Sequence, residues 1–218
     1  MGGYAHDFIG TAQRSGHVKT TSDEAGGVYT FVKEFMVYNG TLNYFWPSYC
    51  RKVVVKLIGG GSGAQGNWAG ATSGKSGAVG ICTILKQNLT ANEQNGIDSI
   101  PIVGGNHGST NGAHNGNDNG GSLSKFGTYI TANGGNNENG NYGNVTTNLP
   151  STSPNYSSGW RGSDSVGGYG NENAGLHSKP NISGILGGEW TPGSAGAESA
   201  GGGGGNGQHG AVWVQEYA

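Results

Sequence analysis

Glycine tracts are the feature of this sequence that most restricts the folds open to it. Glycine accounts for 47 of the 218 residues, and residues 201–205 are five glycines in a row. This is roughly three times the usual share. Each glycine loses more backbone entropy on folding than any other residue. A folded chain with so many glycines must offset that cost through dense backbone hydrogen bonds or close backbone packing. The tracts therefore predict a fold in which the backbone itself makes many of the contacts.

The rest of the composition excludes several classes of protein. Only 11% of the residues are charged, whereas disordered chains are typically highly charged. The net charge of −2 provides no basic footprint for nucleic acid. The longest apolar run, residues 53–58, is too short to span a membrane and contains Lys56. Cys50 and Cys82 form neither a disulfide framework nor a metal-ligand spacing, so we expect two partly buried thiols beside strands.

Two apolar segments at the ends of the glycine-rich region predict a pair of neighbouring strands. Residues 51–58 (RKVVVKLI) run directly into GGG, and residues 211–217 (AVWVQEY) come directly after GGGGGNGQHG. This arrangement predicts that the two strands lie side by side, with Trp213 and Tyr217 in the core. No amphipathic helical pattern of useful length occurs in the sequence. We therefore expect a mainly β fold with little or no α-helix.

The first fifty residues contain only seven of the glycines and differ in composition from the rest of the chain. Residues 28–49 are rich in aromatic and β-branched side chains, which are typical of strands. Asn39-Gly40, between MVY and TLNYFW, predicts a two-residue hairpin turn. The sequence thus predicts a small β-rich N-terminal module over residues 1–50, which includes Trp46, and a glycine-rich domain over residues 51–218.

The glycine tracts need a regular conformation, because a long structureless insertion inside a compact domain is rare. Left-handed extended runs have three residues per turn and no internal hydrogen bonds. Their amides and carbonyls point outward, so neighbouring runs without side chains can stack and bond laterally. The expected architecture is a core made of stacked backbone runs, framed by β-strands and capped by loops.

Three motifs in a fixed order carry a resemblance to a known family. They are VVVKLIGGGSG, SKFGTYITANGG and GGGGGNGQHGAVWVQEY. In this order they resemble the glycine-rich C-terminal domain of bacteriophage tail-fibre and tail-tip adhesins, over residues 51–218. The resemblance implies a sandwich of polyglycine II-type helices at the tip of a tail fibre on the virion. It also implies non-covalent binding of a bacterial surface receptor, either an outer-membrane protein or a surface glycan.

An adhesin of this kind needs an attachment to its particle. We expect residues 1–50 to join the domain to a fibre shaft with a trimeric end, or to mediate a homotrimer. The main alternative is a structural virion or decoration protein that binds no receptor. An ice-binding surface would need a flat, regular face, which the charged and aromatic insertions disfavour.

Aromatic rings within polar glycine-rich loops are the candidate receptor contacts. Tyr and Trp among Asn, Ser and Gly are typical of evolved binding surfaces, and such rings also stack on sugars. The alternative is that they cap the ends of the glycine runs. The loops are expected near residues 64–72, 106–119, 136–144, 154–173 and 188–194. The receptor-binding candidates are Trp68, His107, His114, Tyr142, Tyr156, Trp160, Arg161, Tyr169 and Trp190.

Residues 69–76 (AGATSGKS) loosely match the phosphate-binding loop of nucleotide-binding enzymes. That loop comes directly after a strand, and a helix begins at its Lys-Ser pair. Here the strand pattern ends near Ile58, and the next segment, SGAVGICTIL, opposes a helix. His107 and His114 are seven residues apart, which is not a metal-ligand spacing. We therefore expect no catalytic residues, no metal and no cofactor, and hence no enzyme.

Overall fold

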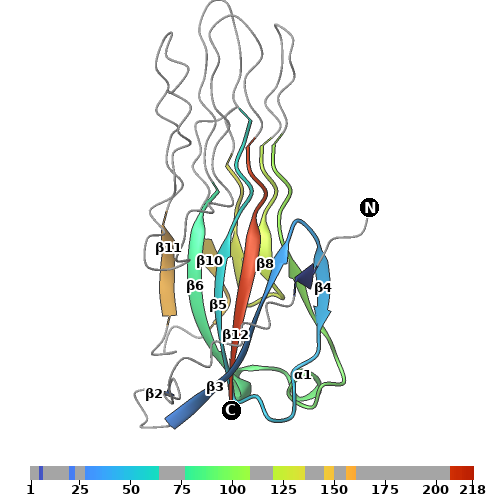
Figure 1. Ribbon diagram of the computed structural model, residues 1–218, viewed down its shortest axis with the longest axis vertical. Helices are drawn as coiled ribbons and strands as arrows, with labels where there is room; N and C mark the ends of the chain where they lie inside the picture. The colour runs from blue at the N-terminus through green and yellow to red at the C-terminus, as the bar shows by residue number, and fades with distance from the viewer. Residues whose placement is uncertain are drawn as a thin grey trace, which may run out of the picture.

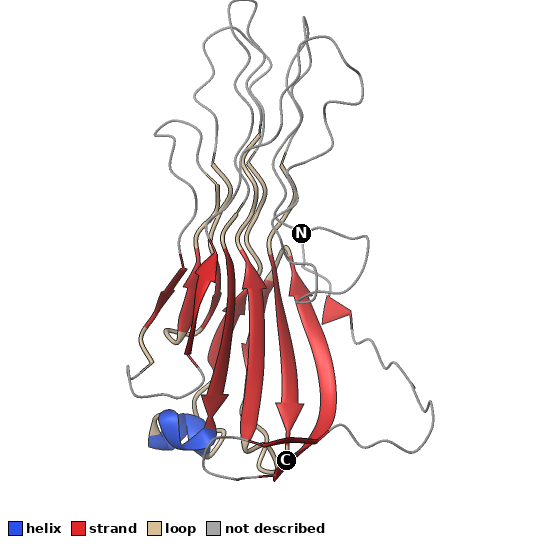
Figure 2. Cartoon of the chain, turned by 90° about the vertical axis from the view of Figure 1, so that its left-hand side faces the viewer, coloured by secondary structure: helices blue, strands red, loops and turns tan. Residues whose placement is uncertain are grey.

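Two antiparallel β-sheets packed face to face make up the described part of the chain (Figures 1 and 2). The structure, a computed structural model, describes residues 5–6, 20–22, 28–63, 77–108, 120–135, 145–149, 156–160 and 207–218. Within these residues the helical elements are the 3-10 turn η1 (Lys86–Asn88) and α1 (Ala91–Gln94). The prediction of a mainly β chain with little helix is therefore confirmed for the described residues.

Twelve strands are described, and Figure 1 labels most of them. Their bounds are β1 Ala5–His6, β2 Thr20–Ser22, β3 Val28–Tyr38, β4 Thr41–Tyr44, β5 Lys52–Ile58, β6 Val79–Leu85, β7 Ile100–Val103, β8 Ser124–Phe126, β9 Ile130–Ala132, β10 Val145–Thr147, β11 Tyr156–Trp160 and β12 Ala211–Tyr217.

The first sheet has the strand order β1-β3-β12-β5-β6-β11, and β2 also pairs with β3. The last strand, β12, lies at its centre between β3 and β5. It pairs with β5 along its full length, from Ala211 opposite Ile58 to Tyr217 opposite Lys52. The predicted pairing of the two segments that flank the glycine-rich region is thereby confirmed.

The second sheet has the strand order β10-β9-β8-β7-β4, and its strands are only three or four residues long. A tight turn links β8 to β9. Gly127 provides the positive φ (54°) that this turn needs, and the Tyr129 N–H donates to the Phe126 carbonyl at 3.1 Å.

The main core lies between the two sheets. Alternate residues of each strand face it, as expected for strands with one face buried. Val53, Val55 and Leu57 come from β5, and Ile102 and Phe126 from the second sheet; all are at most 1% exposed. Burying each such side chain contributes about 1.5–3 kcal/mol.

A second, smaller apolar cluster occupies the other face of the first sheet. Its buried members are Ile58, Val79 and Ala211, and Trp213 is one of the partly buried residues packed against them. The predicted core residue Tyr217 is buried, at 2% exposed, whereas Trp213 belongs to this smaller cluster rather than to the main core.

Beyond one end of the sandwich, six extended segments continue the strands without pairing as strands (Figure 2). We call these segments the glycine stems and this end of the molecule the glycine end. They adjoin β5, β6, β7, β8, β9 and β12, in that order, and comprise residues 59–63, 77–78, 104–108, 120–123, 133–135 and 207–210.

The Asn39-Gly40 turn joins the two sheets and does not close a hairpin. β3, before the turn, pairs with β12, whereas β4, after it, pairs with β7 in the second sheet. The predicted hairpin is therefore wrong, although Asn39 does adopt a positive φ of 47°. The stems provide the physical reason: the Gly104 N–H donates to the Gly40 carbonyl at 2.8 Å, and the Asn39 N–H points to the Gly210 carbonyl at 3.5 Å.

Residues 28–50 also share their core with the rest of the chain. Phe35, Trp46 and Cys50 belong to the same buried cluster as Val53 and Phe126. The predicted boundary after residue 50 therefore does not separate two cores in the described part of the chain. The reason is β3, whose backbone pairs with β12 and so completes the first sheet.

Candidate functional site

The stem of residues 59–63 is the centre of the glycine end and is buried along its whole length. Its backbone groups form hydrogen bonds to all five other stems. The N–H groups of Gly59, Gly60 and Gly61 donate to the carbonyls of Ala78 (3.0 Å), Ser122 (2.9 Å) and Gln208 (2.9 Å), and the carbonyls of Gly60 and Gly61 accept from Gly135 (2.9 Å) and Gly108 (2.8 Å). Backbone bonds between segments that are distant in sequence therefore hold this end together.

Several stem positions admit only glycine because another backbone occupies the space of a Cβ. A Cβ on Gly60 would lie 2.0 Å from the Asn106 carbonyl oxygen, and one on Gly121 would lie 2.0 Å from the Gly60 oxygen. A Cβ on Gly134 would lie 1.9 Å from the Gly121 oxygen. In each case the glycine Cα approaches a carbonyl oxygen, as in the weak Cα–H···O contacts between neighbouring strands.

The chain topology places four long connections at the glycine end. Residues 64–76 and 109–119 each join two stems, residues 136–144 join a stem to β10, and residues 161–206 join β11 to the last stem. At the opposite end, the fully described connections are residues 45–51, 86–99 and 127–129. These four connections therefore all begin and end at the glycine end.

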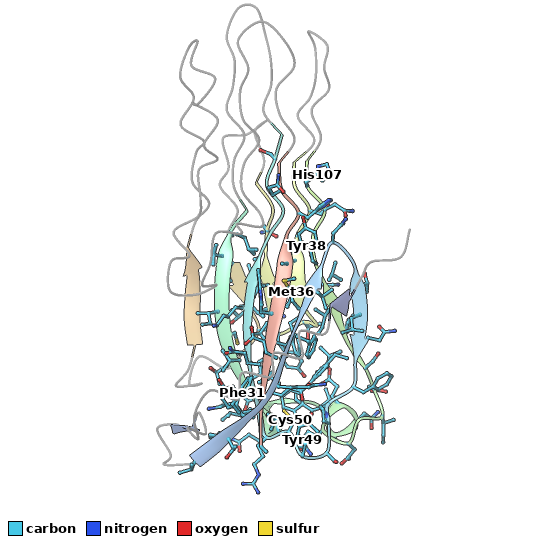
Figure 3. All side chains as sticks on the ribbon, in the orientation of Figure 1. Phe31, Met36, Tyr38, Tyr49, Cys50 and His107 are labelled. Carbon is cyan, nitrogen blue, oxygen red and sulfur yellow. The ribbon has the colours of Figure 1, made fainter. Side chains whose placement is uncertain are left out.

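Two histidines fasten the stems to the turn between the sheets. His209 Nδ1 accepts the backbone N–H of His107 at 3.1 Å, and His209 Nε2 lies 3.3 Å from the side-chain amide of Asn39. The centroid of the His209 ring lies 4.3 Å from that of His107 and 5.4 Å from that of Tyr38. Burial, with a smaller effect of His107, lowers the pKa of His209 below its usual value. Figure 3 shows His107 and Tyr38 near the glycine end.

Three of the nine predicted receptor contacts lie among the described residues. His107 lies in the stem 104–108, partly buried against His209. Tyr156 and Trp160 lie in β11, the strand at the edge of the first sheet, so their placement in a loop is wrong. The physical reason is that the edge of β6 has backbone groups free to pair with a further strand. β11 pairs with them through its backbone, which does not depend on its side chains. The six outside the described residues are Trp68, His114, Tyr142, Arg161, Tyr169 and Trp190.

The chain just after the loose phosphate-loop match forms a strand. β5 ends at Ile58, as predicted, and β6 begins at Val79, three residues after Ser76. A phosphate loop presents the N-terminus of a helix at this position. Residues 69–76 themselves lie outside the described residues.

The described part of the chain holds no cluster of metal ligands. There, no group of three or more His, Cys, Asp or Glu side chains is arranged to hold a metal ion. Nor does this part contain a helix long and apolar enough to cross a membrane.

The end opposite the stems holds a buried carboxylate that the sequence analysis missed. Glu216 is 0% exposed, its Oε2 accepts the Tyr49 hydroxyl, and its Oε1 lies 3.6 Å from Lys33 Nζ. Burial raises the pKa of both Tyr44 and Tyr49. Glu216 adds to the rise in pKa at Tyr49, and Cys50 and then Glu216 add to it at Tyr44. The sequence pattern that could have revealed the burial of Glu216 is the alternation along β12, which places it on the same face as Val212 and Val214. Figure 3 labels Tyr49 and Cys50 at this end.

The sequence matches no protein-family model, and no curated protein matches it.

Proposed function

We propose that this protein is a tail-fibre tip adhesin of a phage or phage-tail-like particle, which binds a bacterial surface receptor non-covalently. The observation that carries the proposal is the placement of the four long connections at one end, on stems joined by backbone hydrogen bonds. The receptor is an outer-membrane protein or a surface glycan. The three ordered motifs that resemble tail-fibre adhesins support the same function.

A rigid base favours binding by the segments that it carries. Segments held in their bound shape lose less conformational entropy when a receptor engages them. The connections also carry aromatic residues that suit a binding surface: Trp68 in residues 64–76, Tyr142 in 136–144 and Trp190 in 161–206. We assign receptor contact to these connections.

We also propose that the stems are the first turns of polyglycine II-type helices that continue into the glycine tracts. The support is their lateral backbone bonding and the close approach of Gly60, Gly121 and Gly134 to neighbouring carbonyls. Amide hydrogen exchange tests this proposal on residues 201–206. Slow exchange of these amides is expected, and exchange at the rates of an unstructured peptide would exclude the continuation.

The attachment to a fibre belongs at the other end of the molecule. Val28, Phe45 and Ile97 are 69%, 55% and 66% exposed, and all three lie at the end opposite the stems. Exposed apolar side chains mark a contact surface where they form a contiguous patch. We propose that residues 1–50, which include Val28 and Phe45 at this end, join a fibre shaft with a trimeric end; a homotrimer is the alternative arrangement.

Binding of fluorescently tagged protein to a panel of intact bacteria, measured by flow cytometry, tests the function. Saturable staining of a few strains is expected, with loss of staining in mutants that lack one surface protein or glycan. Folded protein that stains no strain, alone or mounted on its fibre, would contradict the proposal and favour a structural virion component.

Matched variants locate the binding surface. Trp68→Ala and Trp190→Ala, in the connections at the glycine end, are expected to weaken staining at least tenfold. Ile97→Ala removes a side chain that is 66% exposed at the opposite end, and unchanged staining is expected. Equal loss in all three variants would show that the glycine end is not the binding surface.

A further inference from the structure

We propose that His209 is a pH-sensitive latch at the base of the stems. His209, in the stem 207–210, holds the stem 104–108 through its Nδ1 only while its imidazole is neutral. The latch would regulate the receptor-binding end, so its effect on adhesion rests on the proposed function. The latch itself depends only on contacts among described residues.

The hydrogen bonds around His209 select one tautomer of its ring. Nδ1 accepts the backbone N–H of His107 at 3.1 Å, so Nδ1 carries no proton. A neutral imidazole then carries its proton on Nε2. The atom of Asn39 that lies 3.3 Å from Nε2 is the amide nitrogen Nδ2, and two donors cannot pair. The Asn39 amide is therefore turned over in this tautomer, so that its oxygen accepts the Nε2–H. His209 in this form bonds to both the neighbouring stem and the turn.

A second proton on His209 removes the bond to the stem. It binds at Nδ1, which then faces the His107 N–H, donor against donor. Among the described residues, the titratable groups that face the ring are His107, from the stem 104–108, and the phenol of Tyr38, from β3. Neither is a carboxylate that would stabilise the new charge, and partial burial makes the charge still less favourable.

The stems 104–108 and 207–210 are also bonded to the rest of the glycine end. The Gly108 N–H donates to the Gly61 carbonyl in the central stem, and the Gly210 N–H donates to the Gly105 carbonyl, both at 2.8 Å. Loosening at His209 therefore acts on segments next to the buried centre. The connection of residues 109–119 begins one residue after Gly108.

The sign of the pH dependence depends on the direction of the pKa shift. The pKa of His209 is lowered in the folded chain, so the open or unfolded chain binds the proton more tightly. The latch is fully effective above the ordinary histidine pKa of about 6.5. Its contribution falls as the pH drops from there towards the lowered pKa.

Nuclear magnetic resonance of the folded wild-type protein tests the latch without any receptor. Nitrogen-15 shifts of the His209 ring are expected to show the Nε2–H tautomer at pH 7.5. The protection factor of the His107 amide, which corrects for intrinsic exchange, is expected to fall between pH 7.5 and 5.0, because the lowered pKa of His209 favours the open state in acid. An Nδ1–H tautomer, or a protection factor that does not change, would overturn the proposal.

Two variants separate the latch from general acid sensitivity. In His209→Asn, the side-chain oxygen replaces Nδ1 as an acceptor but does not titrate, so a pH-independent protection factor is expected. In His107→Gln the backbone donor remains, so the pH dependence is expected to persist. The same fall in protection in His209→Asn as in wild type would assign the effect to another group. Should His209→Asn fail to fold, the tautomer and protection measured on wild type still decide.

Cell staining then tests the link to function. Wild-type staining at pH 5.5 is expected to fall at least threefold relative to pH 7.5, and His209→Asn staining is expected to stay constant. A pH-dependent latch with pH-independent staining would overturn its role in adhesion and leave the adhesin itself supported. Absence of staining at both pH values, with the latch present, would count against the adhesin instead.

Discussion

At the scale of single residues, the stability of the fold depends on the contacts that Glu216 makes. Its carboxylate is fully buried, with Tyr49 bonded to Oε2 and Lys33 3.6 Å from Oε1. In Tyr49→Phe the Oε2 loses its donor, and leaving a buried polar group unpaired costs about 1–3 kcal/mol. Urea unfolding is expected to show this loss. Lys33→Met is the comparison: Lys33 is 54% exposed, and its 3.6 Å distance to Oε1 is too long for a hydrogen bond, so a smaller loss than in Tyr49→Phe is expected. The reverse order would mean that Lys33 holds the carboxylate.

The two free cysteines are also buried, as their positions beside strands predicted. Burial raises the pKa of Cys50 to about 11 and that of Cys82 to about 12. The thiolate is the reactive form, so a disulfide reagent at pH 8 is expected to modify neither thiol within minutes in the folded protein. Both are expected to react in denaturant. Rapid reaction of one thiol in the native protein would contradict its burial.

At the scale of the elements, the stems depend on glycine in a way that a strand does not. A Cβ on Gly121 would lie 2.0 Å from a backbone oxygen, whereas one on Gly80, in β6, would lie 3.0 Å from the side chain of Val145. Side chains can move aside, so Gly80→Ala is expected to cost about 1 kcal/mol and Gly121→Ala about 3 kcal/mol or more. Denaturant unfolding of the two variants checks this. Equal costs would mean that the stems are loosely packed.

Element by element, the sequence predicted what depends on local pattern and missed what depends on neighbours. The strands at residues 52–58 and 211–217 and their pairing were predictable from alternation and from the glycines beside them. The hairpin at Asn39-Gly40 was wrong because the turn bonds to two stems that are far away in sequence. The short helix α1 was missed, although Thr90 and Glu93 form the capping box that marks its start. Four residues are too few to show a helical period.

In our proposal, the whole molecule has a receptor-binding end and an attachment end. Substitutions in β11 test whether the receptor-binding surface extends onto that strand. Tyr156→Ala with Trp160→Ala is expected to reduce cell staining and to change the melting temperature by less than about 2 °C, which corresponds to less than 1 kcal/mol in a chain of this size. Trp213→Ala, in the smaller apolar cluster, is expected to lower the melting temperature by about 4 °C or more and to leave staining per folded molecule unchanged. A large loss of stability in the β11 variant would instead favour the alternative that these rings seal the sandwich.

At the scale of the whole molecule, the sequence predicted a boundary after residue 50, but the described residues on its two sides share one core. Residues 28–50 differ from the glycine-rich region in composition, yet β3 and β4 each complete one of the two sheets. Composition shifts mark domain boundaries only when each part can bury its own core. The candidate site was predicted as a set of loops, and the topology brings their ends together; the Asn39-His107-His209 contact joins residues too far apart in sequence for any local pattern to reveal it.

The antiparallel stems have a consequence for inheritance. Both ends of residues 109–119 are held by the same network of backbone hydrogen bonds, and no described strand or core residue lies between them. A single uninterrupted stretch of coding sequence could therefore be exchanged there, or changed in length, while the stems 104–108 and 120–123 keep their register. Recombination between related genes at the glycine codons that flank such a segment would change what the molecule recognises without changing how it folds.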